Sequence, residues 1–125
     1  MSEHNLHDIV MHIVCVKPIF LKQVLSILSN LVPGASAHQA GQVLEYLMNI
    51  LSRVANQDFT SKIRIMETTL LWLQRCSSDL QVLTDNIELI TETLTECNSA
   101  EHLSHLLEIF VKMVSVAPKL TRALI

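Results

Sequence analysis

The chain has 125 residues, of which 50% are hydrophobic and only 4% aromatic, and its formal net charge at pH 7 is −3. This composition excludes a disordered chain, and two glycines with three prolines favour helices over a sheet with frequent turns. No stretch approaches the roughly 18 consecutive apolar residues that a membrane-spanning helix requires, so no membrane association is expected.

The first two predicted helices are joined at a proline. Residues 3–16 repeat apolar side chains at helical spacing, and Pro18 ends this helix because proline disfavours helical geometry at Lys17. Pro18 also suits the first turn of the next helix, which we expect to run to Val32 and to end at Pro33-Gly34. Its predicted apolar arc comprises Leu21, Val24, Leu25, Leu28, Leu31 and Val32.

A third helix is predicted from about Ala37 to Asn56. Ser36 and Gln39 have the spacing of a capping box at its start. The apolar side chains recur at helical spacing and are predicted to face the core; they are Val43, Leu44, Leu47, Leu51 and Val54.

The stretch from Thr60 to Ser78 predicts a helix with almost no polar side, with Asp58 or Thr60 as its N-cap. It has two neighbouring stripes of mostly apolar residues. The first comprises Ile63, Met66, Leu70 and Leu73, and the second comprises Ile65, Thr69, Trp72 and Cys76. The positions left for water are Arg64, Thr68, Leu71 and Arg75. A helix that is apolar over most of its circumference must be packed on several sides, so we expect it at the centre of the fold.

Two further helices are predicted at 79–97 and 100–116. The first has a narrow apolar stripe, and its opposite side holds the acidic residues Asp85, Glu88, Glu92 and Glu96. The second is apolar around most of its surface and leaves a strip of Glu101, Ser104, His105, Glu108, Lys112 and Ser115 for water. Pro118 then opens a short apolar segment, 118–125, which has no polar closing helix. Because repeat arrays need a polar end to stay soluble, this segment either folds back onto the helix 100–116, meets another chain, or continues into further residues of the protein. We expect residues 1–125 to be a single all-helical domain and a fragment of a longer protein.

The helices pair with a period of about 40 residues, since the odd members begin near Glu3, Ala37, Asp79 and Pro118. The junction around Pro118 also repeats the junction around Pro18. On this period and these joints, the chain resembles the HEAT and armadillo class of helical repeats. The resemblance implies a stacked, slightly curved array that holds protein partners without catalysis.

The predicted fold is therefore all-α, with six to seven antiparallel helices stacked as HEAT-like or armadillo-like hairpins. A compact six-helix bundle built from the same helices is the alternative.

A groove along the second, central and sixth helices is the predicted partner-binding surface. Its residues are Lys22, Arg64, Thr68, Leu71, Trp72, Arg75, His105, Glu108 and Lys112. Leucine, tryptophan and arginine together are typical of an interface anchor, although core packing is the favoured interpretation of Trp72. The acidic face of 79–97 is interpreted first as a solvated surface and second as a docking face for a basic partner.

Metal binding and catalysis find little support in the sequence. The zinc-ligand residue types on the first helix are His4, Asp8, His12 and Cys15. Residues eight apart lie about 12 Å apart along a helix, whereas one zinc ion holds its ligands at about 2 Å, so at most two can chelate together. No serine lies in a glycine-flanked elbow, and two glycines cannot build a phosphate-binding loop. We predict no enzyme activity, no cofactor and no metal.

The three cysteines indicate the cellular compartment of the protein, and the charge distribution indicates which partners it can bind. Cys15, Cys76 and Cys97 lie far apart in apolar patterns, which is typical of reduced thiols and favours the cytoplasm or nucleus. The N-terminus lacks the pattern of a signal peptide. Residues 76–111 carry seven acidic side chains and no Lys or Arg, so direct nucleic-acid binding is not expected.

The first hypothesis for function is an intracellular protein-interaction module of a larger scaffold, which binds a peptide or helix of a partner. The second is a homodimerisation domain that associates through 118–125. The third is a metal-binding or enzymatic helical domain.

Overall fold

The computed structural model describes residues 17–55, 58–75 and 81–116, and these residues form helices and short joints without any strand, so the all-α prediction is confirmed. The elements are α2 (Pro18–Leu31), the short 3₁₀ helix η1 (Val32–Gly34), α3 (Ala37–Arg53), α4 (Phe59–Arg75), α5 (Gln81–Asp85), α6 (Ile87–Thr95) and α7 (Ala100–Val116). None of the described helices has the length and apolar character needed to cross a bilayer. The predicted helix 3–16, with its candidate zinc ligands, and the segment 118–125 lie outside the described residues.

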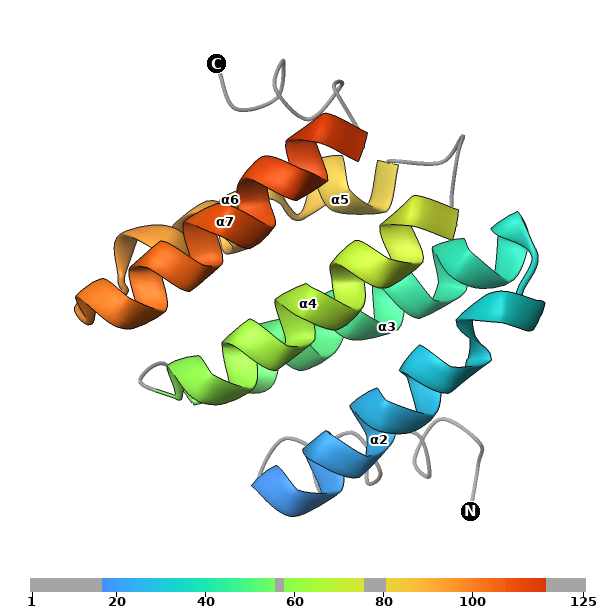
Figure 1. Cartoon of the computed structure of the whole chain (residues 1–125), viewed down its shortest axis with the longest axis horizontal. Helices are drawn as coiled ribbons and strands as arrows, with labels where there is room; N and C mark the ends of the chain where they lie inside the picture. The colour runs from blue at the N-terminus through green and yellow to red at the C-terminus, as the bar shows by residue number, and fades with distance from the viewer. Residues whose placement is uncertain (1–16, 56–57, 76–80, 117–125) are drawn as a thin grey trace.

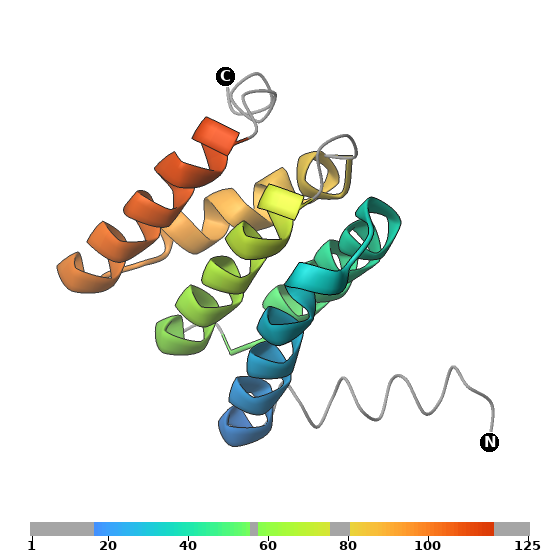
Figure 2. The ribbon, with the colours of Figure 1, turned by 45° about the vertical axis from the view of Figure 1, so that its right-hand side comes forward.

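The helices form two layers. Helices α2, α4 and α7 lie side by side and run in the same direction, and α3 lies behind α4 and runs antiparallel to it (Figures 1 and 2). Helices α5 and α6 continue the second layer behind α7. Helix α4 packs against α2, α3 and α7, which confirms its predicted central position.

The core follows the predicted stripes of α4. Ile63, Met66 and Leu73 are buried, and so are Ile65 and Trp72. Helix α3 contributes the largest share of the remaining core through Ala40, Leu44, Leu47, Met48, Ile50 and Leu51. A buried leucine or isoleucine side chain contributes roughly 1.5–3 kcal/mol relative to exposure, so this shared interior is the main source of stability.

The helix starts depend on local chemistry that the sequence predicts. Lys17 is extended and Pro18 occupies the first turn of α2, where a missing N–H costs nothing. At α3 the backbone N–H of Gln39 donates to Ser36 Oγ at 3.2 Å, and the backbone N–H of Ser36 donates to Gln39 Oε1 at 3.0 Å. The predicted capping box is therefore confirmed. At α4 the N–H of Ser61 donates to Asp58 Oδ1 at 3.2 Å, which makes Asp58 the cap.

Thr68 was predicted to face water, and this prediction is wrong. The side chain is buried at 4% exposure, and its hydroxyl donates to the carbonyl oxygen of Arg64 at 2.9 Å. Thr69 makes the same bond to Ile65. A threonine that satisfies its hydroxyl within its own helix can be buried at little cost, so polarity alone misassigned this position.

The single helix predicted at 79–97 is divided in two. Asn86 leaves helical geometry (φ −110°, ψ 19°), and its N–H donates to the Leu83 carbonyl three residues earlier. Asp85 and Asn86 are residues whose short polar side chains compete for local backbone groups, which favours a turn over a continuous helix. The break separates Asp85 on α5 from the remaining acidic residues on and after α6.

Helix α7 is less covered than predicted. Leu107 and Val111 were expected to be buried, yet they are 46% and 65% exposed. Its buried residues are Leu106, Ile109 and Met113, and among the described helices it packs mainly on α4 and α6. Leu107 and Val111 lie one turn apart, so α7 carries an exposed apolar stripe.

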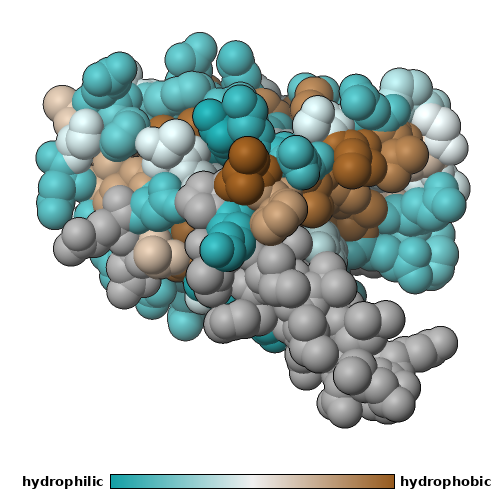
Figure 3. Space-filling model, turned by 90° about the horizontal axis from the view of Figure 1, so that it is seen from below, coloured by the Kyte–Doolittle hydropathy of each residue, from teal (hydrophilic) through white to brown (hydrophobic). Residues whose placement is uncertain are grey.

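Helix α2 also exposes part of its predicted apolar arc. Leu31, which belongs to the predicted arc, is 55% exposed, and Ile19 and Ile27, which lie outside it, are 65% and 60% exposed. Viewed from below, the molecule shows a band of hydrophobic side chains on the face where α2 lies, bordered by hydrophilic residues (Figure 3). Helix α2 therefore carries more apolar surface than its contact with α4 covers.

Trp72 is a core residue, as the favoured interpretation held, with 1% of its surface exposed. Its indole Nε1 is buried and has no hydrogen-bond partner, the single such side-chain atom found among the described residues. Leaving a buried donor unpaired costs about 1–3 kcal/mol. Cys97 is also buried, and its thiol donates to the Ser99 carbonyl at 3.6 Å, consistent with a reduced cysteine packed as a small hydrophobic residue.

Candidate protein-binding groove

A hollow of about 290 Å³ lies between the outer sides of α4 and α7, and we refer to it as the α4–α7 groove. It is lined by Glu67, Leu70 and Leu71 from α4 and by His105, Glu108, Ile109 and Lys112 from α7. Ile109 is buried, Leu70 is half-buried and Leu71 is 42% exposed. The groove therefore combines an apolar base with charged side chains at its sides.

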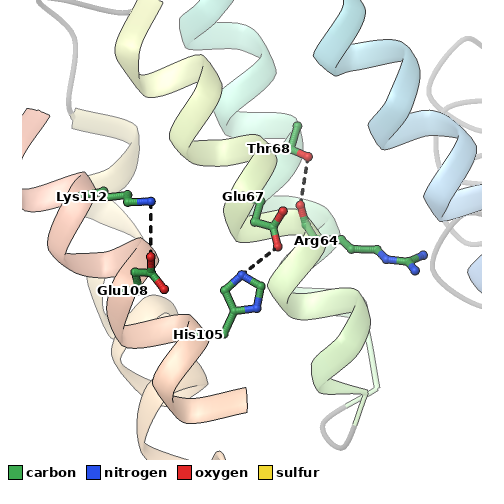
Figure 4. Close-up of polar contacts among 6 residues, drawn as sticks. All are labelled: Arg64, Glu67, Thr68, His105, Glu108 and Lys112. Atoms are coloured by element: carbon green, nitrogen blue, oxygen red, sulfur yellow. Dashed lines mark hydrogen bonds and ion pairs between the residues drawn. The ribbon is translucent and has the colours of Figure 1, made fainter. Parts of the chain in front are cut away.

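Two polar side-chain contacts lie along the groove (Figure 4). His105 Nε2 lies 3.2 Å from Glu67 Oε1 and links α7 to α4. Lys112 Nζ lies 3.6 Å from Glu108 Oε1, one turn away on the same helix. All four side chains are about half exposed or more, and such surface pairs contribute only about 0–1 kcal/mol. Exchanging these contacts for contacts with a partner therefore costs little.

The structure brings together four of the nine predicted partner-binding residues. Leu71, His105, Glu108 and Lys112 line the α4–α7 groove. Arg64 is exposed, but its side chain extends toward α2 and away from Glu67 and His105 (Figure 4). Lys22 is exposed on α2 and does not line the hollow.

Of the remaining three predicted residues, two are not surface contacts of this groove. Thr68 and Trp72 are buried, and the side chain of Arg75 lies outside the described residues. Thr68 and Trp72 are therefore wrong as residues of the predicted binding surface, because both pack in the core instead of continuing the exposed surface of α4.

Sequence reasoning missed Glu67, Leu70 and Ile109. Glu67 lies four residues before Leu71, a spacing that places two side chains on the same side of a helix and could have identified it. Leu70 and Ile109 were assigned to the core because both lie in apolar stripes. A side chain in such a stripe can still form the base of a groove where two helices diverge.

The acidic residues form a separate surface. Asp85, Glu88, Glu92 and Glu96 are all exposed, as predicted. Glu88 and Glu92 lie one turn apart on α6, and within the described part of the chain no Lys or Arg pairs with either. Like charges at this spacing destabilise a helix by a few tenths of a kcal/mol per pair.

We next consider whether the described residues could bind a metal ion. Across residues 17–55, 58–75 and 81–116, no group of three or more His, Cys, Asp or Glu side chains is close enough to hold a metal ion. His105 contacts Glu67, while His102 contacts the ring of Phe59 at 6.4 Å between centroids, so the two histidines face different neighbours. What the groove offers is an apolar surface with charges of both signs beside it.

Comparison with protein-family models, with curated proteins and with solved structures finds no match to the chain.

Proposed function

We propose that this chain is a non-catalytic protein-interaction module of a larger intracellular assembly, and that it binds a peptide or helix of a partner protein in the α4–α7 groove. The observation that carries the proposal is Leu71, a leucine that is 42% exposed beside half-buried Leu70 and among four polar side chains, of which Glu67, Glu108 and Lys112 are charged. An apolar contact surrounded by polar side chains is the usual composition of a peptide-binding surface.

The groove suits an amphipathic helix or an extended peptide with one apolar anchor. The anchor would cover Leu71 and fill the hollow above Ile109, while polar residues of the partner would meet Glu67 on the α4 side and the Glu108–Lys112 pair on the α7 side. Because the existing side-chain contacts are exposed and weak, a partner can replace them without first breaking the fold.

The two-layer arrangement also supports a place in the HEAT-like or armadillo-like class of helical repeats. Helices α2, α4 and α7 form one layer in which each helix lies beside the next, and such layers build the binding surfaces of repeat proteins (Figure 2). Under this proposal the chain contributes one part of an extended surface of a scaffold.

Peptide selection on the purified chain tests the groove. Peptides are selected from a displayed random library, and their affinities are then measured for the chain, for Leu71→Asp and for the control Ile27→Asp. The control places the same charge at an exposed position on α2, outside the groove. We expect Leu71→Asp to weaken binding at least about tenfold, as loss of an interface anchor does, and Ile27→Asp to leave it unchanged. Circular dichroism checks that both variants remain helical. Selected peptides that bind Leu71→Asp as well as the unmodified chain would reject the groove.

Self-association is the second candidate, and the open side of α7 favours it. Leu107 and Val111 lie one turn apart and are 46% and 65% exposed, and Val116 extends the exposed apolar residues toward the end of the helix. Light scattering at increasing concentration tests it: a dimer that Val111→Asp dissociates supports the hypothesis, and a monomer at every concentration rejects it.

The acidic face of α6 is a further candidate docking surface, for a basic partner. Glu88 and Glu92 repel each other in the isolated chain, and a basic segment would relieve that repulsion. Such an interaction would weaken steeply with salt, which distinguishes it from binding in the groove.

A further inference from the structure

Helices α2 and α7 lie on the two sides of α4 in one layer, and each carries apolar residues in steps of four, three and four positions (Figure 2). On α2 these residues, which we call the α2 seam, are Phe20, Val24, Ile27 and Leu31. On α7 they form the α7 seam, which comprises Leu103, Leu107, Phe110 and Val114. Three side chains of the α2 seam are 45–60% exposed, and Leu107 of the α7 seam is 46% exposed. This spacing is that of two helices that pack as a coiled coil.

The two seams match each other residue by residue. Every residue of the α7 seam lies 83 positions after its counterpart in the α2 seam. Because α2 and α7 run in the same direction, a second copy placed beside α7 without turning over presents its α2 parallel to that helix (Figure 1). Aligning Phe20 of one copy with Leu103 of the other then aligns all four pairs, over roughly 16 Å of helix.

The same alignment places the cores of the two copies on one side of the contact. In a parallel pair, the residues that follow Phe20 and Ile27 lie opposite the residues that precede Leu107 and Val114. These neighbours all belong to the core or pack against it; they are Leu21 and Leu28 on α2 and Leu106 and Met113 on α7. The added copy therefore continues the two-layer arrangement.

The charges beside the two seams are opposite in sign. Helix α2 and its N-cap residue carry Lys17 and Lys22 and no acidic residue. Residues 87–116, which form α6, α7 and their joint, carry one lysine and five exposed acidic side chains, Glu88, Glu92, Glu96, Glu101 and Glu108. Opposite charges favour contact between the two different seams, and like charges disfavour contact of either seam with its own copy.

From the matched spacing and the opposite charges, we propose that copies of this chain associate head to tail, with the α2 seam of one copy packed against the α7 seam of the next. Because the contact joins two different surfaces, every added copy leaves a seam free, and the assembly grows beyond a dimer. The proposal rests on the self-association candidate and names the surface that meets α7. It shares no residue with the lining of the α4–α7 groove.

Light scattering on the 125-residue chain measures the growth. A contact of two heptads is small beside the roughly 1,200 Å² of a stable interface, so we expect weak association with a Kd on the order of 100 μM. As the concentration rises to about ten times this Kd, the mean mass should exceed twice the chain mass of 14.1 kDa.

Two variants each remove one seam. Ile27→Asp places a charge in the α2 seam and Leu107→Asp places one in the α7 seam, at positions that are 60% and 46% exposed. Each variant alone should remain monomeric. The matched control is Ser26→Asp, which adds the same charge at an exposed position of α2 outside the seam and should still assemble. Circular dichroism checks the folding, and Val111→Asp, 65% exposed beside the α7 seam, replaces Leu107→Asp if that variant loses helical content.

Mixing the two variants identifies the head-to-tail contact. The intact α2 seam of Leu107→Asp can pack against the intact α7 seam of Ile27→Asp, so an equimolar mixture should form dimers and nothing larger. The proposal is overturned by a chain that stays monomeric or stops at a dimer, by Ile27→Asp that associates like the unmodified chain, or by a mixture that stays monomeric. A dimer that does not grow would still support self-association through α7, and a monomer that binds selected peptides would leave the groove proposal intact.

Discussion

Glu67 on α4 and His105 on α7 approach to 3.2 Å between Oε1 and Nε2, and this contact joins two helices whose residues are 38 positions apart in the chain. The side chains are 51% and 49% exposed, so water screens the pair from both sides. Its position beside Leu71 and Ile109 makes it part of the α4–α7 groove, and its exposure makes it a minor element of stability.

A double-mutant cycle tests this assignment. With Glu67→Gln and His105→Gln, singly and together, we expect a coupling free energy of unfolding below about 1 kcal/mol, because exposed pairs gain little over their hydration. Urea unfolding at low and high salt measures it. A coupling of several kcal/mol that persists in high salt would show that the pair is instead a structural link between α4 and α7.

Because Thr68 is buried and Arg64 is exposed, substitutions at these two sites on α4 should change the free energy of unfolding by very different amounts. Thr68→Asp should lower the free energy of unfolding by about 3 kcal/mol, since it places an unpaired charge in the core. Arg64→Asp, at an exposed site one turn earlier, should change it by less than about 0.5 kcal/mol. Urea denaturation of both variants makes the comparison, and equal effects would contradict the burial of Thr68.

The capping box at the start of α3 predicts the effect of a single serine. Ser36→Ala removes the acceptor for the Gln39 N–H and should cost about 1 kcal/mol. The matched control is Ser26→Ala, at an exposed position inside α2, which should change stability by less than about 0.5 kcal/mol. Thermal unfolding followed by circular dichroism distinguishes the two, and a Ser36→Ala variant as stable as the control would argue against the cap.

The like charges of α6 predict a stabilising substitution. Glu92→Lys replaces repulsion from Glu88 by attraction at the favourable spacing and should raise the free energy of unfolding by about 0.5 kcal/mol at low salt. The gain should largely vanish in 1 M NaCl, where the screening length is about 3 Å. Glu45→Lys on α3 is the control, because no charged residue lies three or four positions from it. If both variants raise the free energy of unfolding equally, repulsion between Glu88 and Glu92 does not explain the gain.

The sequence by itself determined the helices and most of their ends. Pro18 and the Ser36–Gln39 capping box act within a few residues, so they could be identified without knowledge of the fold. The sequence narrowed the cap of α4 to Asp58 or Thr60, and the structure shows that it is Asp58. The central place of α4 also followed from the sequence, because a helix with apolar side chains on most sides has to be surrounded. The break at Asn86 was missed although its signal, two turn-forming residues in succession, is local as well.

Only the tertiary structure decided which surface residues meet. Periodicity states which side of each helix faces inward, but the angle and offset between two helices determine which side chains lie opposite each other. The pairing of Glu67 with His105 and the use of Leu70 and Ile109 as the base of a groove depend on how α7 lies against α4. The burial of Thr68 and the unpaired nitrogen of Trp72 depend in the same way on which helices cover α4, and a one-dimensional pattern does not contain that information.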